Sequence, residues 1–508
     1  MKKFFRLLFS RFTVIFFAIL LQVVAAALVI TVFQSYYLWI RIVSTALTMI
    51  VLLGIINRDM TIEGKLPWAL TVALLPVLGV ILYLSFSRNY ASKHERKLFA
   101  ALPRANFDNT AANASENVAG QIRYLNKMGN YSFDNTDTEY FASGEEFWQD
   151  LLTELDKAEK FIFMEYFIVE RGKMFDAVLE ILQRKVKEGV EVRLMYDDVG
   201  SLPHVGHPFC HNMRKSGIDC VRFGKLKPFV SAVYNNRDHR KITVIDGKVG
   251  YTGGLNLADE YINETHPFGY WKDTAVKLVG RGVAALTYMF LQMFDMAQNK
   301  SEHYEKYLVE TALFANEREQ ERDCKGQGIV VPFADGPKPL YPDYVARSAY
   351  LNMINMSERS LYITTPYLVC DEAFNDAIIR AADRGIDVNI VIPGIPDKKS
   401  VYCLSKQSAN KLVKHGVKLY TYTKGFIHAK GIVSDDVVGI VGTINLDYRS
   451  FMHHYEDGVF MYDTAALHEM KSDMLSTIAE SERITESHRL KLWEQVVCFF
   501  ANVFRPML

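Results

Sequence analysis

The sequence has few of the features that mark disulfide-rich, fibrous or nucleic-acid-binding chains. Its 508 residues include six cysteines, with no CxxC pair, which excludes a disulfide scaffold and favours buried, reduced thiols. The formal net charge is +0, so overall basicity gives no argument for nucleic acid. With 49% hydrophobic and 23% charged residues, the composition excludes a disordered chain, a collagenous chain and a coiled coil. The length instead requires two or three packed domains.

Positive charge is concentrated at the N-terminus, together with long apolar runs. Residues 1–104 hold twelve Lys and Arg but three acidic residues. The apolar stretches 12–33, 38–56 and 66–86 are each long enough to cross a hydrocarbon core of about 30 Å. A cleaved signal peptide is the alternative for the first stretch, but the apolar run continues well past the small residues that could be cleaved. We therefore predict a membrane segment at 1–90 with two to three hydrophobic helices.

The basic residues around these stretches predict their orientation, because Lys and Arg stay on the cytoplasmic side. If all three stretches cross, the basic residues divide six to five and select no orientation. If only 38–56 and 66–86 cross, the division is nine to two; both divisions leave out Arg41, which lies within the second stretch. We therefore expect a multi-pass protein of the cell membrane with cytoplasmic termini and catalytic domains. The stretch 12–33 would then be re-entrant or interfacial, and three spans remain the alternative.

Beyond a polar linker, the chain alternates strands and helices, and it does so twice. Residues 161–169 and 190–196 predict strands joined by a helix that ends near Gly189, and 361–369 and 386–393 repeat this pattern with Gly385. The predicted fold class is α/β, with two similar halves side by side. The predicted segments after the membrane segment are a linker at 91–140, a first domain at 141–300, a connector at 301–335, a second domain at 336–485 and a C-terminal amphipathic helix at 486–508.

The C-terminal helix is predicted to place Trp493, Val497, Phe500 and Phe504 on one face. Basic residues beside that face would be available to anionic headgroups. A buried packing helix is the alternative.

A polar motif repeats with the same internal spacing in both halves. Its two copies are His239, Lys241, Asp246, Gly253 and Asn256, and His428, Lys430, Asp435, Gly442 and Asn445. A single His-x-Lys pair is usually a solvated strand face. Unconstrained loops would not preserve four spacings in two copies, so the repeat favours a functional site.

The motif residues suit the chemistry of a phosphodiester. Residues two apart on a strand share a face, so each His and its Lys point to the same side. The two histidines would carry nucleophilic and acid–base work, while the lysines would stabilise charge on the non-bridging oxygens. Asn256 and Asn445, just past glycines, would add amide donors to the phosphate.

The acids that support the histidines are predicted to lie outside the motifs. Asp246 is an odd number of residues from His239, so in a straight strand it cannot share the histidine's face, and with the following glycine it makes a good hairpin turn. We therefore interpret Asp246 and Asp435 as closing or supporting the strand end. Asp273 and Glu456 are the candidates for orienting the histidines.

Two other groups of histidines are candidates for metal ligands or substrate contacts. A cluster in one loop matches no zinc spacing and sits among turn residues; it consists of His204, His207, Cys210 and His211. We predict no metal and no cofactor. His453 and His454, beside Glu456, could position substrate or could equally be surface residues.

The doubled HxKxxxxD motif, with its Gly and Asn, resembles the phospholipase D superfamily. The sequences HRKITVIDGKVGYTGGLN and FIHAKGIVSDDVVGIVGTINLDYRSF, with the N-terminal membrane segment, resemble the bacterial cardiolipin synthase family. The resemblance covers nearly the whole chain. It implies two phospholipase D-like α/β repeats around one shared active site, with the catalytic residues His239, Lys241, Asp246, His428, Lys430 and Asp435. The chain departs from strict symmetry at Gly254, where the second copy has Thr443.

The resemblance also implies the reaction, a metal-free phosphatidyl transfer. One histidine attacks phosphorus to form a covalent phosphatidyl-histidine, and the other protonates the leaving alcohol and later deprotonates the acceptor. By resemblance we assign His239 as nucleophile and His428 as general acid/base, and the near symmetry leaves the exchanged roles open. Phosphatidylglycerol would be both donor and acceptor, giving cardiolipin and glycerol, and other anionic membrane phospholipids are the expected partners.

Four other functions compete with this interpretation. A hydrolytic phospholipase D would use the same residues with water as acceptor. A phosphatidyltransferase could use another lipid such as phosphatidylethanolamine. A nuclease of the superfamily has no need of the hydrophobic first ninety residues. A membrane scaffold with decayed catalytic residues is disfavoured because both motif copies are intact.

Overall fold

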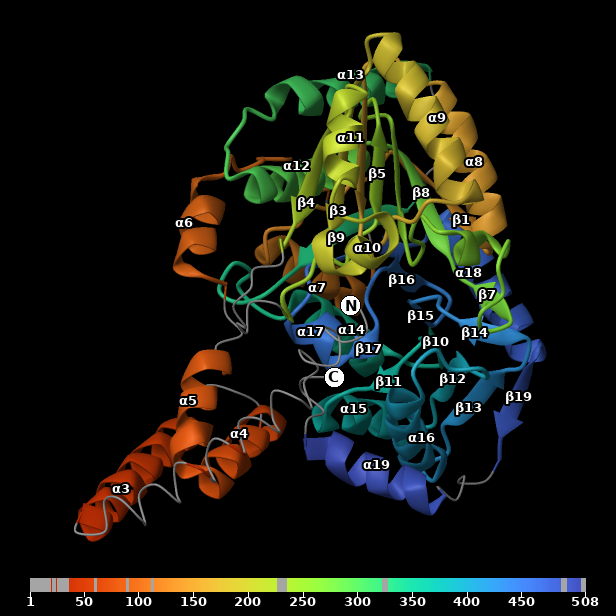
Figure 1. Ribbon diagram of the computed structural model, residues 1–508. Coiled ribbons are helices and arrows are strands. Elements are labelled where there is room, and N and C mark those ends of the chain that lie inside the picture. Colours follow the sequence, from red (N-terminus) through yellow and green to blue (C-terminus); the bar gives the residue numbers. More distant parts are fainter. Residues whose placement is uncertain are drawn as a thin grey trace. The chain divides into compact units, whose positions relative to one another are not determined.

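The computed structural model describes residues 36–58, 62–87, 91–110, 114–225, 235–321, 328–485 and 491–503, together with Leu20 and Val24 (Figure 1). The chain divides into two compact units. One comprises Met1–Asn89 and Val503–Pro506, and the other comprises Tyr90–Asn502 and Met507–Leu508.

The first unit contains three apolar helices, α3 (Tyr37–Ile56), α4 (Ile62–Leu74) and α5 (Pro76–Phe86). Within the described residues, α3 alone has the length and composition to cross a membrane, over Leu38–Ile56. The predicted single stretch at 66–86 is instead broken at Leu75, where φ is −127° and ψ is 73°. Pro76 causes the break, because it lacks the N–H for a continuing helix and disfavours helical backbone before it. The stretch 12–33 lies outside the described residues apart from Leu20 and Val24, so the number of spans stays a prediction.

The first half of the larger unit is built on a seven-stranded sheet in the order β1-β8-β6-β5-β2-β3-β4. Its strands are β1 (Thr136–Phe141), β2 (Phe161–Tyr166), β3 (Glu191–Asp197), β4 (Asp219–Phe223), β5 (Ile242–Ile245), β6 (Val249–Gly253) and β8 (Ala275–Gly280). Its helices are α8 (Gly144–Asp156), α9 (Lys173–Lys187), α10 (Asp198–Val205), α11 (Phe209–Lys215), α12 (Val283–Gln298) and α13 (Glu305–Glu321).

The second half is built on an eight-stranded sheet in the order β19-β13-β12-β10-β15-β16-β18-β9. Its strands are β9 (Ile329–Asp335), β10 (Ser360–Thr364), β12 (Asp387–Pro393), β13 (Lys418–Tyr422), β15 (Gly431–Ser434), β16 (Val438–Gly442), β18 (Glu456–Tyr462) and β19 (Ser481–Ile484). Its helices are α14 (Val345–Met356), α15 (Glu372–Asp383), α16 (Lys399–Val413), α17 (Tyr448–Met452), α18 (Ala465–Ala479) and α19 (Leu492–Val503).

The two sheets have the same topology, strand for strand. Each contains a strand–helix–strand unit with parallel pairing, β2 with β3 and β10 with β12. The connecting helices end where Gly189 and Gly385 adopt φ of 92° and 88°, the left-handed conformation that a glycine C-cap provides. Strand β19 is the one addition to the second sheet. The predicted α/β fold of two similar repeats is confirmed.

The segments predicted as a linker and a connector contribute structure to the two sheets. The 91–140 segment contains α6 (Lys93–Ala101), α7 (Glu116–Lys127) and nearly all of β1, and the 301–335 segment contains α13 and β9. Strand β1 begins before residue 141 and β9 before residue 336, so each sheet includes a strand that lies ahead of the predicted domain boundary. Strand β1 has a polar sequence because it is the edge strand of the first sheet and some of its residues are partly exposed. Strand β9 tolerates Pro332 because it is an edge strand of the second sheet.

The core of the larger unit is layered. Helices α8, α9 and α11 cover one face of the first sheet, and α7, α14, α15 and α16 cover one face of the second. Between the sheets, one cluster joins Phe163 and Phe290 of the first half to Val433, Val459 and Met470 of the second. Helices α12 and α18 both contribute to this central layer. The two halves therefore share a core, which places their duplicated motifs next to each other.

Strand pairing also crosses between the halves. Strand β7 (Tyr270–Lys272) of the first half pairs in parallel with β14 (Gly425–Ile427) of the second (Figure 1). An isolated parallel bridge joins Asp238 of the first half to Tyr455 of the second. Each of these pairings lies immediately before a motif histidine, so main-chain hydrogen bonds fix the positions of both histidines across the junction.

Candidate active site

The two motif histidines stand just ahead of equivalent central strands, His239 before β5 and His428 before β15. The main-chain N–H of His239 donates to the carbonyl of Tyr455 at 2.9 Å, and that of His428 donates to the carbonyl of Lys272 at 2.7 Å. Each donor and its acceptor belong to opposite halves of the unit. The site is therefore assembled at the junction between the repeats.

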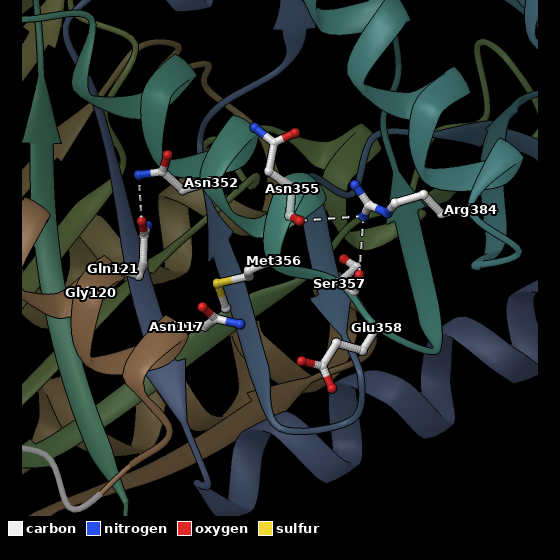
Figure 2. Close-up of a pocket in the computed structure, with 9 residues that line it drawn as sticks. All are labelled: Asn117, Gly120, Gln121, Asn352, Asn355, Met356, Ser357, Glu358 and Arg384. Atoms are coloured by element: carbon white, nitrogen blue, oxygen red, sulfur yellow. Dashed lines mark hydrogen bonds between the residues drawn. The ribbon is translucent and has the colours of Figure 1, made fainter.

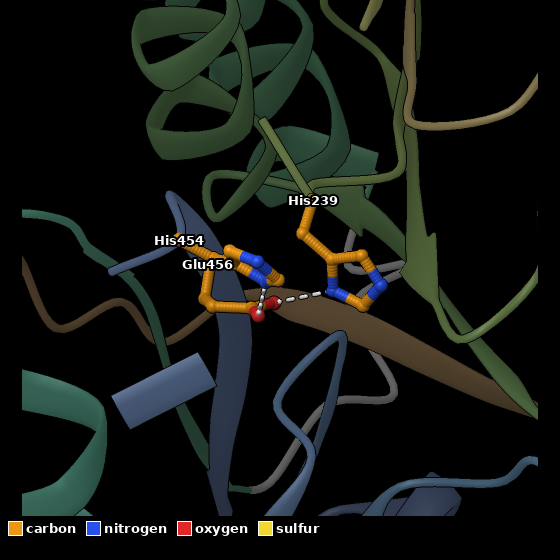
Figure 3. Close-up of side chains that lie close together, drawn as sticks. All are labelled: His239, His454 and Glu456. Carbon is orange, nitrogen blue, oxygen red and sulfur yellow. Dashed lines mark hydrogen bonds and ion pairs between the residues drawn. The ribbon is translucent and has the colours of Figure 1, made fainter. Parts of the chain in front are cut away.

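Each histidine also contacts an acid from the opposite half. Nδ1 of His239 lies 2.9 Å from Oε2 of Glu456, as Figure 3 shows. Nδ1 of His428 lies 2.5 Å from Oδ2 of Asp273. All four side chains are buried. The structure thus brings Glu456 and Asp273 to the histidines that sequence reasoning expected them to orient, and the arrangement leaves Nε2 of each ring for chemistry.

The two motif lysines are buried beside the histidines. Nζ of Lys241 donates to the carbonyl oxygen of His239 at 2.6 Å, and Nζ of Lys430 donates to that of His428. Burial lowers the pKa of Lys241 to about 8 and that of Lys430 to about 7. The acids Asp273 and Glu456 oppose this lowering, because a neighbouring negative charge favours the ammonium form.

The histidines are held mainly in the neutral form. Burial lowers the pKa of both His239 and His428 to about 4, and the two lysines act in the same direction. Burial alone would raise the pKa of Glu456 and Asp273, but contact with the histidines brings both below their ordinary values. The site therefore combines neutral imidazoles with ionised acids. Such histidines can act as nucleophile and as base.

The two acid–histidine pairs are not identical. Oγ1 of Thr443 donates to Oε2 of Glu456 at 2.5 Å. At the equivalent Gly254, an added Cβ would overlap Oδ1 of Asp273, so no side chain fits there. Glycine at 254, where the second copy has Thr443, is thus a steric consequence of the carboxylate of Asp273, which lies closer to the backbone than that of the longer Glu456.

The predicted amide donors differ in their surroundings. Oδ1 of Asn256 accepts from the N–H of Ile168 at 3.0 Å, and its Nδ2 donates to the hydroxyl of Tyr261 at 2.6 Å. Asn445 is buried, and its Oδ1 has no hydrogen-bond partner among the described residues. Both polar atoms of the Asn256 side chain therefore already have hydrogen-bond partners, one of them just beyond the end of β2. Phosphate binding by either asparagine remains a prediction.

The motif aspartates do not reach the histidines. The carboxylate of Asp246 accepts from three consecutive main-chain N–H groups at 2.7–2.8 Å, those of Glu159, Lys160 and Phe161. Asp435 does the same for Glu358, Arg359 and Ser360 at 2.7–2.9 Å. Both aspartates follow the strand whose other end carries the histidine, and both adopt a positive φ. Their position fits the supporting role that the odd spacing indicated.

Aromatic side chains that sequence reasoning missed surround the histidines. The ring of Phe167 lies 5.2 Å from that of His239, centroid to centroid. Around His428 the corresponding distances are 5.6 Å to Tyr261, 5.2 Å to Trp271 and 5.7 Å to Phe426. Phe426 could have been found, because it lies two residues before His428 on an extended segment. Trp271 and Tyr261 could not, because they come from the other half.

Two further features stand apart from these residues. His204 contacts Glu170 at 2.7 Å between Nδ1 and Oε2. A polar pocket of about 600 Å³ is lined by residues of α7 and α14 together with Ser357, Glu358 and Arg384. Figure 2 shows these lining residues. The main-chain N–H of Glu358 donates to the carboxylate of Asp435, so this pocket lies at the end of β15 away from His428. None of its lining residues belongs to the duplicated motifs.

The fold and the paired His-x-Lys sites define a two-repeat protein of the phospholipase D-like class. A family model described as cardiolipin synthase, PLD-like domain, matches residues 151–268 and 350–478. A second, described as the phospholipase D-nuclease N-terminal segment, matches residues 46–88. The family models therefore cover both halves and the apolar N-terminal helices.

Relatives match nearly the whole chain. An uncharacterized protein of Streptococcus mutans is 38% identical over 90% of this chain and 99% of its own length. A cardiolipin synthase of Halalkalibacterium halodurans is 32% identical over 87% of this chain and 89% of its own length. The crystal structure of phosphatidylserine synthase from Haemophilus influenzae shares the fold, with a TM-score of 0.57 and 14% identity, and it covers 77% of this chain and 100% of that one.

The chain belongs to the cardiolipin synthase family of the phospholipase D superfamily. The predicted superfamily, the resemblance to cardiolipin synthases and the phosphatidyltransferase class are confirmed. The roles of the individual residues stay predictions.

Substitution of Asp246 tests its supporting role. Asp246→Ala removes the acceptor of three N–H groups at a buried position and should destabilise the protein by about 3 kcal/mol. Asp246→Asn keeps one acceptor oxygen and tolerates the positive φ, so its loss should be smaller. Thermal unfolding of the detergent-solubilised protein measures both. A variant Asp246→Asn that unfolds like wild type yet has lost phosphatidyl transfer would show that Asp246 acts on the reaction instead.

The lowered lysine pKa values predict an alkaline limit to the rate. With pKa values of about 7 for Lys430 and about 8 for Lys241, these cations lose their charge as pH rises, so kcat/KM should fall above about pH 7. Lys430→Arg keeps its charge to about pH 12 and should move this decline to higher pH, although its maximal rate is lower. Lys430→Ala should lower the rate by about 100-fold or more.

A surface lysine, Lys411 on α16, provides the control for the pH profile. Lys411→Arg should leave the decline where wild type has it. An alkaline decline that Lys430→Arg does not shift would assign it to another group.

Proposed function

We propose that the protein transfers a phosphatidyl group from one phosphatidylglycerol to the glycerol of a second, forming cardiolipin and glycerol. The observation that carries this proposal is the reciprocal pairing of His239 with Glu456 and His428 with Asp273. It supplies two imidazoles whose Nδ1 atoms contact acids, which leaves Nε2 of each ring for a two-step displacement at phosphorus. The named cardiolipin synthases among the relatives support the choice of lipids.

In the first step His239 is the nucleophile. Its Nε2 lone pair attacks phosphorus and the bond to the leaving glycerol oxygen breaks, while His428 donates a proton to that oxygen. Glu456, at Nδ1 of His239, stabilises the positive charge that the ring acquires. The approaching phosphodiester anion favours the protonated form of His428, which supplies the acid that the step needs. Lys241 and Lys430 stabilise the non-bridging oxygens.

In the second step His428, now neutral, takes the proton from a glycerol hydroxyl of the second phosphatidylglycerol. That oxygen attacks phosphorus, and the bond between phosphorus and His239 breaks. The proton that His428 gave to the first alcohol is thus recovered from the second. In both steps Asp273 contacts Nδ1 of His428, which keeps Nε2 of the ring toward the substrate. The reaction consumes no metal, oxidant or cofactor.

We also propose that the protein is a multi-pass membrane protein with its catalytic unit in the cytoplasm, an arrangement that the distribution of basic residues supports. Helix α19 supports a further contact with lipid. Its inner side is attached to α16 through buried Cys498 and through Glu494, which lies 3.2 Å from Nζ of Lys406. Its outer side exposes four apolar residues, Leu492 (78%), Trp493 (51%), Val496 (50%) and Phe499 (71%).

The exposed face of α19 differs from the predicted one. Trp493 belongs to both, but Val497 is half-buried, and Phe499 rather than Val497 extends the apolar surface. The side chain of Phe500 and residue Phe504 lie outside the described part of the chain. Helical spacing identifies an apolar face but does not say which side of the helix a neighbouring helix covers.

The transfer reaction can be tested directly. Purified full-length protein in vesicles with radiolabelled phosphatidylglycerol, and with no second lipid or metal, should yield cardiolipin and an equal amount of glycerol. His239→Ala and His428→Ala should each abolish both products, because each removes a group that the two steps require. Exposed His303 provides a control, and His303→Ala should retain wild-type activity.

Each alternative gives a different product in this assay. Phosphatidic acid without cardiolipin would mean that water is the acceptor, and no product would mean that another lipid is required. Substantial transfer by either histidine variant, with a normal unfolding temperature, would contradict the two-histidine mechanism.

The lipid contact of α19 predicts that its outer face lies in the membrane interface. A fluorophore on Phe499→Cys in the full-length protein should be quenched by lipids that carry nitroxide groups near the headgroup. The five cysteines that the structure describes are buried, so labelling should favour the new thiol. The same label on Lys187→Cys, exposed on α9, should be quenched much less. Equal quenching at both positions would refute this contact.

A further inference from the structure

His454 gives the two acid–histidine pairs of the active site different surroundings. It lies two residues before Glu456, and the residue two before Asp273 is Trp271. Glu456 therefore stands between two histidines, His239 and His454, whose ring centroids are 5.3 Å apart. Asp273 contacts His428 alone among histidines in the described residues. The proposed nucleophile thus has a second imidazole beside it, and the proposed acid/base does not.

The contact between His454 and Glu456 leaves polar atoms unsatisfied. His454 is 8% exposed and Glu456 is 0% exposed. Nδ1 of His454 lies 3.4 Å from Oε1 of Glu456, and neither atom has a hydrogen-bond partner within the part of the chain that the structure describes. Nε2 of His454 lacks one as well. Buried polar atoms without partners are rare and costly, and here they point to a ligand that binds lone pairs.

The geometry suits a transition-metal ion. One ligand atom from each of His239, His454 and Glu456 lies within 4.8 Å of the others, and Figure 3 shows both histidines directed at the carboxylate. The contacts of His239 with Oε2 and of His454 with Oε1 of Glu456 are 2.9 Å and 3.4 Å. A tetrahedral Zn²⁺ with bonds of about 2.0–2.1 Å places its ligand atoms about 3.3 Å apart. Two histidines and one carboxylate are also a ligand set that zinc uses in proteins.

We propose that His239, His454 and Glu456 form a binding site for a divalent transition-metal ion of the Zn²⁺ type, and that metal bound there blocks the reaction. Metal at this site would inhibit the reaction because one of its ligands, His239, is the proposed nucleophile. It is separate from the metal-free chemistry proposed above, and its effect on rate rests on that proposed function.

Inhibition follows from the proton on the His239 ring. In the active form Nδ1 carries the proton and faces Glu456, which leaves the Nε2 lone pair free to attack phosphorus. A metal at Nδ1 takes that lone-pair position, so the neutral ring must carry its proton on Nε2. The Nε2 atom then has no lone pair for phosphorus. Glu456, bound to the metal, also no longer stabilises positive charge on His239.

The charges nearby make the site reversible. Lys241 and Lys430 both lie close enough to the histidines to affect their protonation, and each opposes a second cation at the same place. The only negative charge among the three ligands is that of Glu456. We therefore expect affinity below that of a dedicated structural zinc site, with complete release to a chelator.

Zinc titration of the untagged full-length protein in detergent tests the inference. Elemental analysis after equilibrium dialysis against ZnCl₂ should find a single zinc per chain above the dialysis buffer, and ZnCl₂ should stop cardiolipin formation until EDTA restores it. His454→Asn removes one ligand and should raise the zinc concentration for half-inhibition by about tenfold or more, relative to its own metal-free rate. His415→Asn removes an exposed histidine beside Asp383 and should change neither result.

The two measurements separate the possible failures. Wild-type protein that retains no zinc would overturn the site, whether or not the protein makes cardiolipin. Equal zinc sensitivity of His454→Asn and wild type would overturn the role of His454. Zinc retention that His454→Asn abolishes, in a protein that forms no cardiolipin, would support the site while refuting the proposed transfer.

Discussion

The reciprocal contact between each motif histidine and an acid of the opposite half is the constraint on which the site depends. Glu456 orients His239 and Asp273 orients His428, so neither repeat holds a complete acid–histidine pair by itself. Main-chain hydrogen bonds from the same two histidines cross the junction as well. The shared core between the sheets, with Phe290 on one side and Met470 on the other, is what makes these short contacts possible.

Burial of this polar cluster accounts for its electrostatics. Two lysines and two acids balance one another while both histidines are neutral, which is the state that the lowered histidine pKa values favour. An arriving phosphodiester adds one negative charge, and a proton on one imidazole restores the balance. The site is thus prepared to carry a single mobile proton between leaving group and acceptor. The same low-dielectric surroundings make the unsatisfied atoms of His454 and Glu456 costly to leave without a partner.

The duplication gives the protein symmetry in its fold and asymmetry in its details. The sheets agree strand for strand, and both motif aspartates bind three main-chain N–H groups at the start of an equivalent strand. Around the acids the two copies diverge, with Thr443 and His454 beside Glu456 but Gly254 and Trp271 at the matching places. These differences give the two histidines unequal surroundings, which equivalent roles in catalysis would not require.

Local periodicity and repetition in the sequence account for the α/β halves, the glycine-terminated helices and the doubled His-x-Lys motif. The odd spacing between His239 and Asp246 also separates their roles. The sequence also pointed to Asp273 and Glu456 without saying which histidine each would meet. The pairing of each acid with its histidine depends on the tertiary structure. The paired residues lie 217 and 155 positions apart in the sequence, and no local pattern records such a contact. The edge positions of β1 and β9, the outer face of α19 and the contact of His454 with Glu456 were likewise decided by which surfaces pack together. The break at Pro76, in contrast, follows from local backbone chemistry.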